Sequence, residues 1–138
     1  MKQWHWIVLI LVMVALVGCG TPTPAAAPTP TGAATLGAEV SVETVSQLVA
    51  EGGVTVIDVR EESEFAGGHI PGAVLIPLGE LPDRVSEVPT DQPVILACRS
   101  DNRSGQAYQF LKQQGFTNVH NMTGGMNAWQ KAGFEVEK

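Results

Sequence analysis

The sequence predicts an α/β fold in which a mostly parallel sheet is flanked by helices on both faces. Short runs of β-branched and other apolar residues, typical of buried strands, recur along the chain. These runs alternate with segments whose apolar residues follow helical spacing. Alternation of this kind indicates strand–helix–strand units, which build parallel sheets.

The first half of the expected fold contains one helix and two strands. Apolar residues within 45–49 share one helical face, and a Gly-Gly pair at 52–53 marks the end of that helix. Residues 54–59 (VTVIDV) form a β-branched run that predicts a buried strand. A shorter apolar run at 73–76, bounded by prolines, predicts a second strand.

The second half repeats the alternation. Residues 94–98 (VILAC) predict another buried strand. The helical spacing of apolar side chains predicts a helix over 104–114, which a glycine follows. A short strand is expected at 119–121 and a final helix around 126–132.

The beginning of the chain indicates a targeting segment. Lys2 precedes an apolar run at 7–17, which is shorter than the roughly 20 apolar residues that span a bilayer. The run suits the core of a secretory signal peptide. Residues 16–19 (LVGC) resemble the lipobox of bacterial lipoproteins, which implies a signal peptide over 1–18 and diacylation of Cys19. An uncleaved signal anchor with an incidental cysteine is the alternative.

A linker and one domain follow. Residues 19–38 are expected to be the lipidated cysteine and a spacer, because Pro, Thr and Ala dominate this stretch and cannot build a core. Residues 39–138 then suffice for one modest domain. The sequence therefore predicts an extracytoplasmic protein that a lipid anchors to a bacterial membrane.

The composition excludes several classes of protein. The 138 residues carry a net charge of −6 without a run of basic residues, so we expect no binding to nucleic acid. Two cysteines and three histidines are too few for a disulfide-stapled scaffold, and they predict no structural metal site. We expect a monomer without a cofactor.

The candidate reactive residue is Cys98, which ends one predicted strand and precedes a predicted helix. In open α/β sheets, ligands bind beyond the carboxyl ends of strands. The loop CRSDNRS at 98–104 would direct free N–H groups inward at a helix N-terminus, and these groups and nearby arginines would stabilise a thiolate. An inert buried thiol at a strand end is the alternative.

Three ordered motifs resemble those of the rhodanese-like sulfurtransferases. Residues 58–73 (DVREESEFAGGHIPGA) resemble the first signature of the family, residues 98–104 its active-site loop, and residues 123–129 (TGGMNAW) its closing signature. The resemblance covers nearly all of 42–136. It implies a rhodanese-like fold.

The resemblance also implies a sulfur-transfer chemistry. Cys98 would attack the outer sulfur of a small anionic donor such as thiosulfate and hold that sulfur as a persulfide, which a thiol or cyanide acceptor would remove. Asp58 and Arg60 would form an ion pair that supports the loop. The substrate-binding residues would be those that follow the cysteine, namely Arg99, Ser100, Asp101, Asn102, Arg103 and Ser104. For each arginine, a solvated surface charge is the alternative.

Two details of the loop bear on its chemistry. Four residues separate Cys98 from Arg103, one fewer than in the rhodanese-fold phosphatases and arsenate reductases, and the shorter loop favours a single sulfur atom over a tetrahedral oxyanion. Asp101 stands where the family commonly has glycine. Aspartate tolerates a left-handed backbone. Its charge would oppose a thiolate unless it pairs with a flanking arginine, so we expect Asp101→Gly to be more active with thiosulfate.

The other candidates are expected to be structural. The ring of His69 would fix a turn, Trp129 would lie in the core, and the acidic residues within 61–64 would form a solvated helix start. His69 and His120 lack the spacing of a metal-binding pair. A non-catalytic rhodanese module, which binds a partner or carries a persulfide passively, stays the alternative to an enzyme.

Overall fold

The computed structural model describes residues 36–138. The signal peptide predicted over 1–18, the lipidation of Cys19 and the linker up to residue 35 lie outside the described residues. Within 36–138, no helix has the length and apolar character needed to cross a membrane. Leu36 packs against the core and the Ala38 carbonyl accepts a hydrogen bond from the Asn121 N–H. Packing therefore begins slightly before the predicted domain boundary at Glu39.

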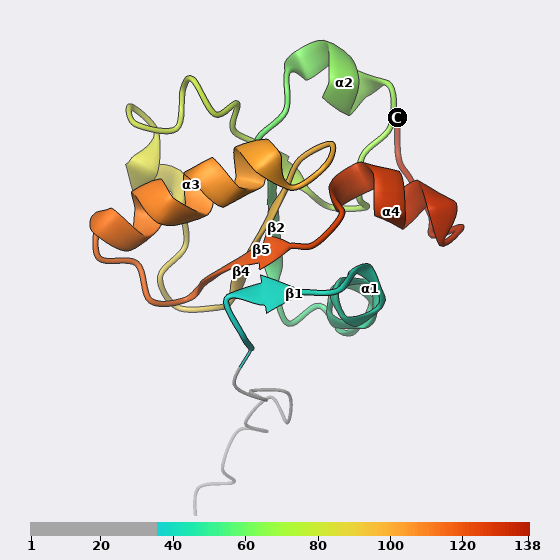
Figure 1. Cartoon of the computed structure of the whole chain (residues 1–138), viewed down its shortest axis with the longest axis horizontal. Helices are drawn as coiled ribbons and strands as arrows, with labels where there is room; N and C mark the ends of the chain where they lie inside the picture. Colours follow the sequence, from blue (N-terminus) through green and yellow to red (C-terminus); the bar gives the residue numbers. More distant parts are fainter. Residues whose placement is uncertain (1–35) are drawn as a thin grey trace, which may run out of the picture.

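Five strands form one sheet in which all neighbouring strands are parallel. The strand order is β1-β5-β4-β2-β3, so β4 is central (Figure 1). The strands are β1 (Glu39–Val40), β2 (Thr55–Asp58), β3 (Val74–Leu75), β4 (Val94–Ala97) and β5 (Val119–Met122). Since every strand points the same way, the loops that follow them gather at one edge of the sheet.

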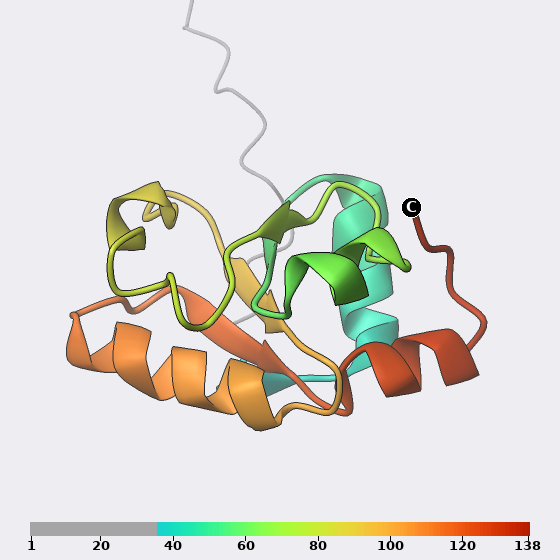
Figure 2. The same ribbon diagram turned by 90° about the horizontal axis from the view of Figure 1, so that it is seen from above.

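Helices cover both faces of the sheet, as predicted. They are α1 (Val42–Glu51), α2 (Glu62–Ala66), the 3-10 helix η1 (Val85–Glu87), α3 (Asn102–Gln113) and α4 (Gly125–Lys131). One buried cluster joins the sheet to α3, and a second joins it to α1 and α4. Figure 2 shows α1 and α4 together, apart from α3 and η1. The predicted α/β fold class is confirmed.

The two-residue period of β4 decides on which face the candidate cysteine lies. Leu96 and Cys98 belong to the cluster under α3, whereas Ile95 and Ala97 belong to the cluster under α1 and α4. All four side chains are buried. Cys98 therefore leaves the strand on the side from which α3 departs.

Two features differ from the sequence-based expectation. Strand β1 was not expected, because its two residues form no periodic pattern and are strands only through pairing with β5. Helix α3 begins at Asn102, two residues before the expected start at 104. Asp101 is its N-cap, with a left-handed backbone, and this turn places Arg103 in the first helical turn.

Candidate active site

Cys98 lies at the carboxyl end of the central strand, in contact with the start of α3. Its side chain is only 1% exposed, and the buried Ser104 hydroxyl donates a hydrogen bond to Cys98 Sγ at 3.2 Å. The backbone N–H groups of the first turn, residues 102–104, have no acceptor within their own helix. Together with the helix dipole and the Ser104 hydroxyl, these N–H groups favour an anionic sulfur.

The Asp101 side chain joins the cysteine loop to the turn before α4. Asp101 has a φ of 67°, the left-handed conformation that the sequence led us to expect it to tolerate. Its Oδ2 accepts a hydrogen bond from the Gly124 N–H at 3.0 Å. Within 36–138 the carboxylate forms no ion pair, so the suggested pairing with a flanking arginine is wrong.

The closing motif holds the backbone of the same loop. The Met126 N–H donates to the Cys98 carbonyl at 2.8 Å, and the Asn127 N–H donates to the Arg99 carbonyl at 3.0 Å. A Cβ on Gly125 would lie 2.5 Å from the Cys98 carbonyl oxygen, and Gly125 has a φ of 56°. Because both the contact and the backbone conformation require glycine, Gly125 allows α4 to approach the loop.

Arg103 forms a two-pronged ion pair with Glu64 of α2. Its Nη1 and Nη2 donate to the two carboxylate oxygens at 2.7 and 2.8 Å. The Arg103 hydrogen bonds lower the pKa of Glu64 to about 2, and the same pair raises the pKa of Arg103. The expectation that Glu64 is only part of a solvated helix start is wrong. Arg103 therefore links α3 to α2, and its guanidinium is already engaged by a carboxylate.

Asp58 and Arg60 form a buried ion pair with a distance of 2.6 Å between Arg60 Nη2 and Asp58 Oδ2. Arg60 Nε also donates to the carboxylate at 2.9 Å, and Nη2 donates to the Gly68 carbonyl at 2.9 Å. These bonds brace residues 58–68. The pair thus supports the cysteine loop only indirectly, through the neighbouring segment.

The two described histidines have structural contacts. His69 Nδ1 lies 3.0 Å from the Phe65 carbonyl oxygen, the ring stacks on Phe65, and the His69 backbone pairs with that of Glu137. His120 Nδ1 lies 2.7 Å from the Gly37 carbonyl oxygen. In the described part of the chain, no cluster of His, Cys, Asp and Glu side chains could hold a metal ion.

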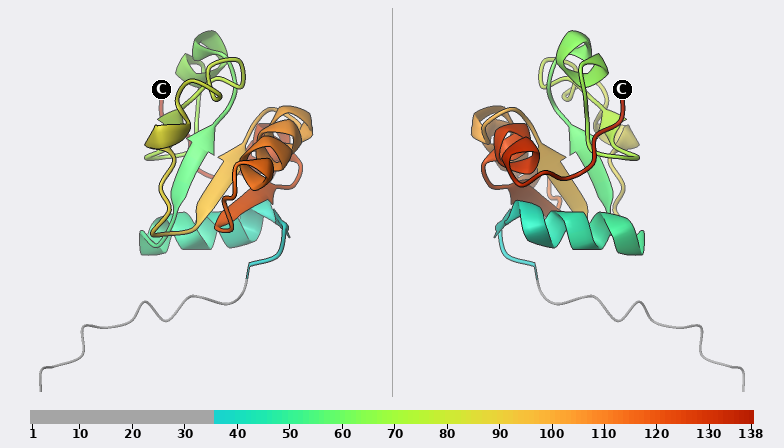
Figure 3. Two further views of the ribbon diagram at one scale, coloured as in Figure 1. Left: turned by 90° about the vertical axis from the view of Figure 1, so that its left-hand side faces the viewer. Right: turned by 90° about the vertical axis from the view of Figure 1, so that its right-hand side faces the viewer.

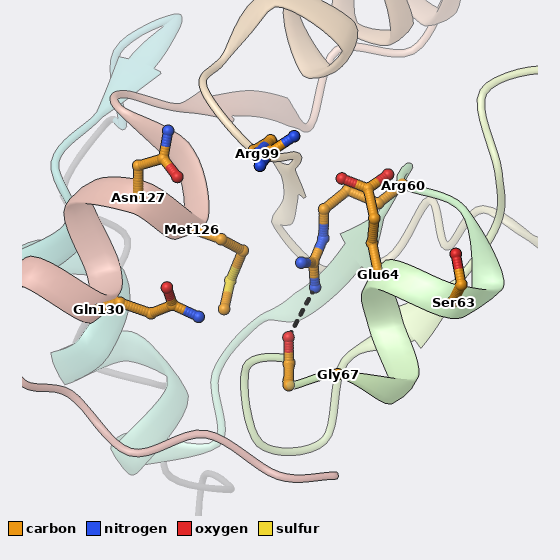
Figure 4. Close-up of a pocket in the computed structure, with 9 residues that line it drawn as sticks. Arg60, Ser63, Glu64, Gly67, Arg99, Met126, Asn127 and Gln130 are labelled. Atoms are coloured by element: carbon orange, nitrogen blue, oxygen red, sulfur yellow. Dashed lines mark hydrogen bonds between the residues drawn. The ribbon is translucent and has the colours of Figure 1, made fainter.

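A pocket of about 320 Å³ opens beside the loop, at the carboxyl edge of the sheet (Figure 4). Its walls follow β2, β4 and β5. The lining residues are Arg60, Ser63, Glu64, Gly67, Gly68, Arg99, Met126, Asn127 and Gln130. Cys98 is not part of the lining, but its neighbour Arg99 is, and the exposed Arg99 side chain forms no ion pair within residues 36–138.

Comparison with known families decides the assignment of this site. Residues 41–132 match the Rhodanese family, described as a rhodanese-like domain. The chain belongs to the rhodanese-like family.

Relatives with printed names extend the comparison. A protein of Allochromatium vinosum named sulfurtransferase is 40% identical over 71% of this chain and 92% of its own length. The thiosulfate sulfurtransferase GlpE of Pseudomonas fluorescens is 35% identical over 62% of this chain and 78% of its own length. The solution structure of a rhodanese-like domain from Anabaena has a TM-score of 0.68 at 28% identity, over 74% of this chain and 80% of that one.

Some relatives are longer than the matched rhodanese-like segment. The chain covers 58%, 50% and 55% of three further proteins, two from Bacillus subtilis and one from a Synechocystis strain. One of the Bacillus proteins is named a putative sulfur carrier protein.

The rhodanese-like loop brings together some of the predicted site residues and leaves others at the surface. Cys98, Ser104 and the Asp101 carboxylate have contacts that shape the loop, and Arg99 lines the pocket. Ser100 is exposed, and the exposed Asn102 side chain accepts a hydrogen bond from Gln106 of its own helix at 2.9 Å. Neither of these two side chains lines the pocket.

Sequence reasoning missed the partners that lie far along the chain. Glu64, Gly124, Asn127 and Gln130 were not named as site residues. The first and last family motifs contain three of them, but their partners became visible only when the fold placed α2 and α4 beside the loop.

Proposed function

We propose that this rhodanese-like protein is a sulfurtransferase that works through a persulfide on Cys98. The Cys98 thiolate attacks the outer sulfur of thiosulfate, a new S–S bond forms, and the old S–S bond breaks with its electron pair leaving on sulfite. An acceptor thiolate or cyanide then attacks the outer sulfur of the persulfide. The Cys98 thiolate leaves, and the product is an acceptor persulfide or thiocyanate.

The hydrogen bond between Ser104 and Cys98 Sγ is the observation that carries this proposal. A buried hydroxyl that donates to sulfur, at the N-terminus of α3, lowers the free energy of an anionic sulfur more than that of a neutral thiol. The sulfurtransferase names of two relatives support the same chemistry. Membership of the family supports a sulfurtransferase-type function, and thiosulfate as the donor is our proposal.

Arg99 is the residue that we assign to attraction of the anionic donor. It is exposed beside the cysteine loop and forms no ion pair within residues 36–138, whereas Arg103 is held by Glu64. A free guanidinium attracts the charged donor and stabilises the sulfite that departs.

A passive sulfur carrier is the second candidate, and the burial of Cys98 favours it. The sulfur-bearing side chain is 1% exposed and lies outside the pocket lining, so a bulky donor cannot touch it without movement of the loop. A module of this kind would receive sulfur from a partner and would not react with free thiosulfate.

Intact mass of the purified full-length chain after exposure to thiosulfate separates these two functions. The sulfurtransferase gains one sulfur atom, and Cys98→Ser, which retains Cys19, does not. A second exposure to cyanide should remove the sulfur and release thiocyanate. A wild-type protein that gains no sulfur from thiosulfate or other small donors would contradict the enzyme and favour the carrier.

We also propose that the protein is anchored to a bacterial membrane, outside the cytoplasm, through a lipid on Cys19. This proposal rests on the lipobox-like residues 16–19 and the apolar run before them. Cys19→Ser should move the protein out of the membrane fraction and abolish incorporation of labelled fatty acid. Retention of label in that variant would contradict lipidation at this residue.

A further inference from the structure

The pocket beside the cysteine loop is larger than the sulfur donor requires. Its volume of about 320 Å³ lies at the lower end of the range of ligand pockets, about 300–1,000 Å³. Thiosulfate would displace only a few water molecules, each of which occupies about 30 Å³ in the liquid. Most of the pocket is therefore available to another molecule.

The charges around the pocket leave one unpaired cation. The Arg60 guanidinium is neutralised by the buried Asp58 carboxylate, and the Glu64 carboxylate is neutralised by Arg103. Arg99 forms no ion pair among residues 36–138. A guanidinium presents a planar pair of donors that match a carboxylate, so the pocket has the electrostatic character of a site for one anionic group.

The remaining polar side chains of the pocket are free to form hydrogen bonds. Asn127 and Gln130 lie on α4, and Ser63 lies on α2 across the pocket (Figure 4). Their side chains are exposed, and none has a hydrogen-bond partner in the described part of the protein. Two amides and a hydroxyl suit a ligand that itself carries an amide.

We propose that this pocket binds the sulfur acceptor, and that the acceptor is a small thiol carrying a carboxylate and an amide, as an N-acylated cysteine does. This inference rests on the proposed function and specifies its second substrate. The carboxylate pairs with Arg99, while Asn127 and Gln130 bind the amide. The acceptor thiolate attacks the outer persulfide sulfur, its own persulfide forms, and the electron pair of the broken S–S bond returns to the Cys98 thiolate.

Two matched acceptors test the inference. N-acetylcysteine and N-acetylcysteine amide differ in the carboxylate, and both carry the reactive thiol. The full chain is first loaded with sulfur by thiosulfate, excess donor is removed, and the second half-reaction is measured with each acceptor over a range of concentrations. The preference, defined as the ratio of the two values of kcat/KM, is then compared between wild type and variants, so that the different intrinsic reactivities of the thiols cancel.

We expect Arg99→Gln to lower the preference for N-acetylcysteine about three- to tenfold, as expected for loss of one partly solvated charge-assisted contact. Gln130→Ala should raise KM for both acceptors by similar factors. Lys131→Gln removes one positive charge from the same helix outside the pocket, and it should leave the preference unchanged.

The outcomes separate this inference from the proposed function. A wild-type chain that never acquires the persulfide would overturn both. A chain that is loaded normally but shows the same preference in Arg99→Gln as in wild type would overturn the acceptor site alone. An equal loss in Lys131→Gln and Arg99→Gln would also overturn it, because the effect would then come from the overall charge of the protein.

Discussion

The Asp101 carboxylate and the Gly124 N–H form a hydrogen bond of 3.0 Å between residues that are 23 positions apart. It connects the loop after β4 to the turn after β5, the same turn whose neighbouring amides bind the Cys98 and Arg99 carbonyls. The conformation of the cysteine loop thus depends on two adjacent parallel strands of the sheet.

Substitution of Asp101 should reveal this dependence in stability measurements. Asp101→Ala removes the acceptor and places an alanine in a left-handed conformation, and we expect the free energy of unfolding to fall by about 2 kcal/mol. Asp101→Asn keeps both an acceptor and a residue that tolerates this conformation, and its loss should be well below 1 kcal/mol. Urea unfolding measures both values. Equal losses in the two variants would show that the hydrogen bond is unimportant.

The charge of Asp101 gives a second, kinetic prediction. A carboxylate near the reacting sulfur opposes its negative charge, so Asp101→Asn should form the persulfide several-fold faster than wild type in single-turnover reactions with thiosulfate. Asp101→Gly, which we expected from the sequence to be more active, also loses the bond to Gly124. We therefore expect Asp101→Gly to gain less than Asp101→Asn, and a slower Asp101→Asn would contradict the electrostatic argument.

Gly125→Ala should damage the site more than any other glycine substitution in α4. The new Cβ would lie 2.5 Å from the Cys98 carbonyl oxygen and 2.7 Å from the Arg99 carbonyl group, so the loop must move. We expect a loss of more than about 3 kcal/mol of stability and at least a hundredfold loss of sulfur transfer. Gly133→Ala is the control, since Gly133 has a φ of 76° in open space and reports the backbone strain alone. Similar losses in both variants would refute the steric explanation.

The ion pair between Glu64 and Arg103 predicts a pH dependence of stability. The pKa of Glu64 is about 2 in the folded protein, below its usual value of 4.5, so the unfolded chain binds more protons between these values. The contribution of Glu64 is therefore present above about pH 5 and is lost as the pH falls toward 2. Glu64→Gln should destabilise the protein by about 1 kcal/mol at pH 7 and much less at pH 2.

Guanidinium unfolding at pH 7, 4 and 2.5 checks this dependence. The comparison uses Glu87→Gln as a control, because Glu87 pairs with Arg84 on the exposed surface of the protein. The Glu87→Gln curve should run parallel to that of wild type. A Glu64→Gln curve that also runs parallel would mean that the pair contributes nothing to folding.

Ser104→Ala should slow the reactions of Cys98 without disturbing the fold. Loss of the hydroxyl removes the donor 3.2 Å from Sγ, and we expect about tenfold slower alkylation by iodoacetamide at pH 7. Ser100→Ala, on the exposed part of the same loop, should react like wild type. Unchanged alkylation in Ser104→Ala would remove the observation on which the proposed function rests.

Much of the fold was predictable because it follows local patterns. The apolar run at 94–98 is a strand in any environment that buries both faces, and the helical spacing within 104–114 is sufficient to predict α3. Cys98 was recognisable from its place between these two elements. The short β1 was not predictable, since two residues become a strand only when β5 lies beside them.

The side-chain pairs of the site were less predictable than the strands. Glu64 and Arg103 are 39 positions apart, and each has the composition of an ordinary surface residue. The sequence allowed Asp101 to pair with an arginine, whereas the structure gives it a backbone N–H partner. In both cases the partner depends on how α2 and α4 sit at the edge of the sheet, and no local pattern encodes that placement.

The parallel direction of β1 has a consequence for how substrates reach the protein. Residues 37–40 run along β5 from His120 toward Thr123, so Leu36 lies at the amino ends of the strands, whereas the pocket lies at their carboxyl ends. Figure 3 shows this entry point and α2 at opposite ends of the molecule. A leash attached ahead of Leu36 would hold the domain from behind, and incoming donors and acceptors would meet an unobstructed mouth.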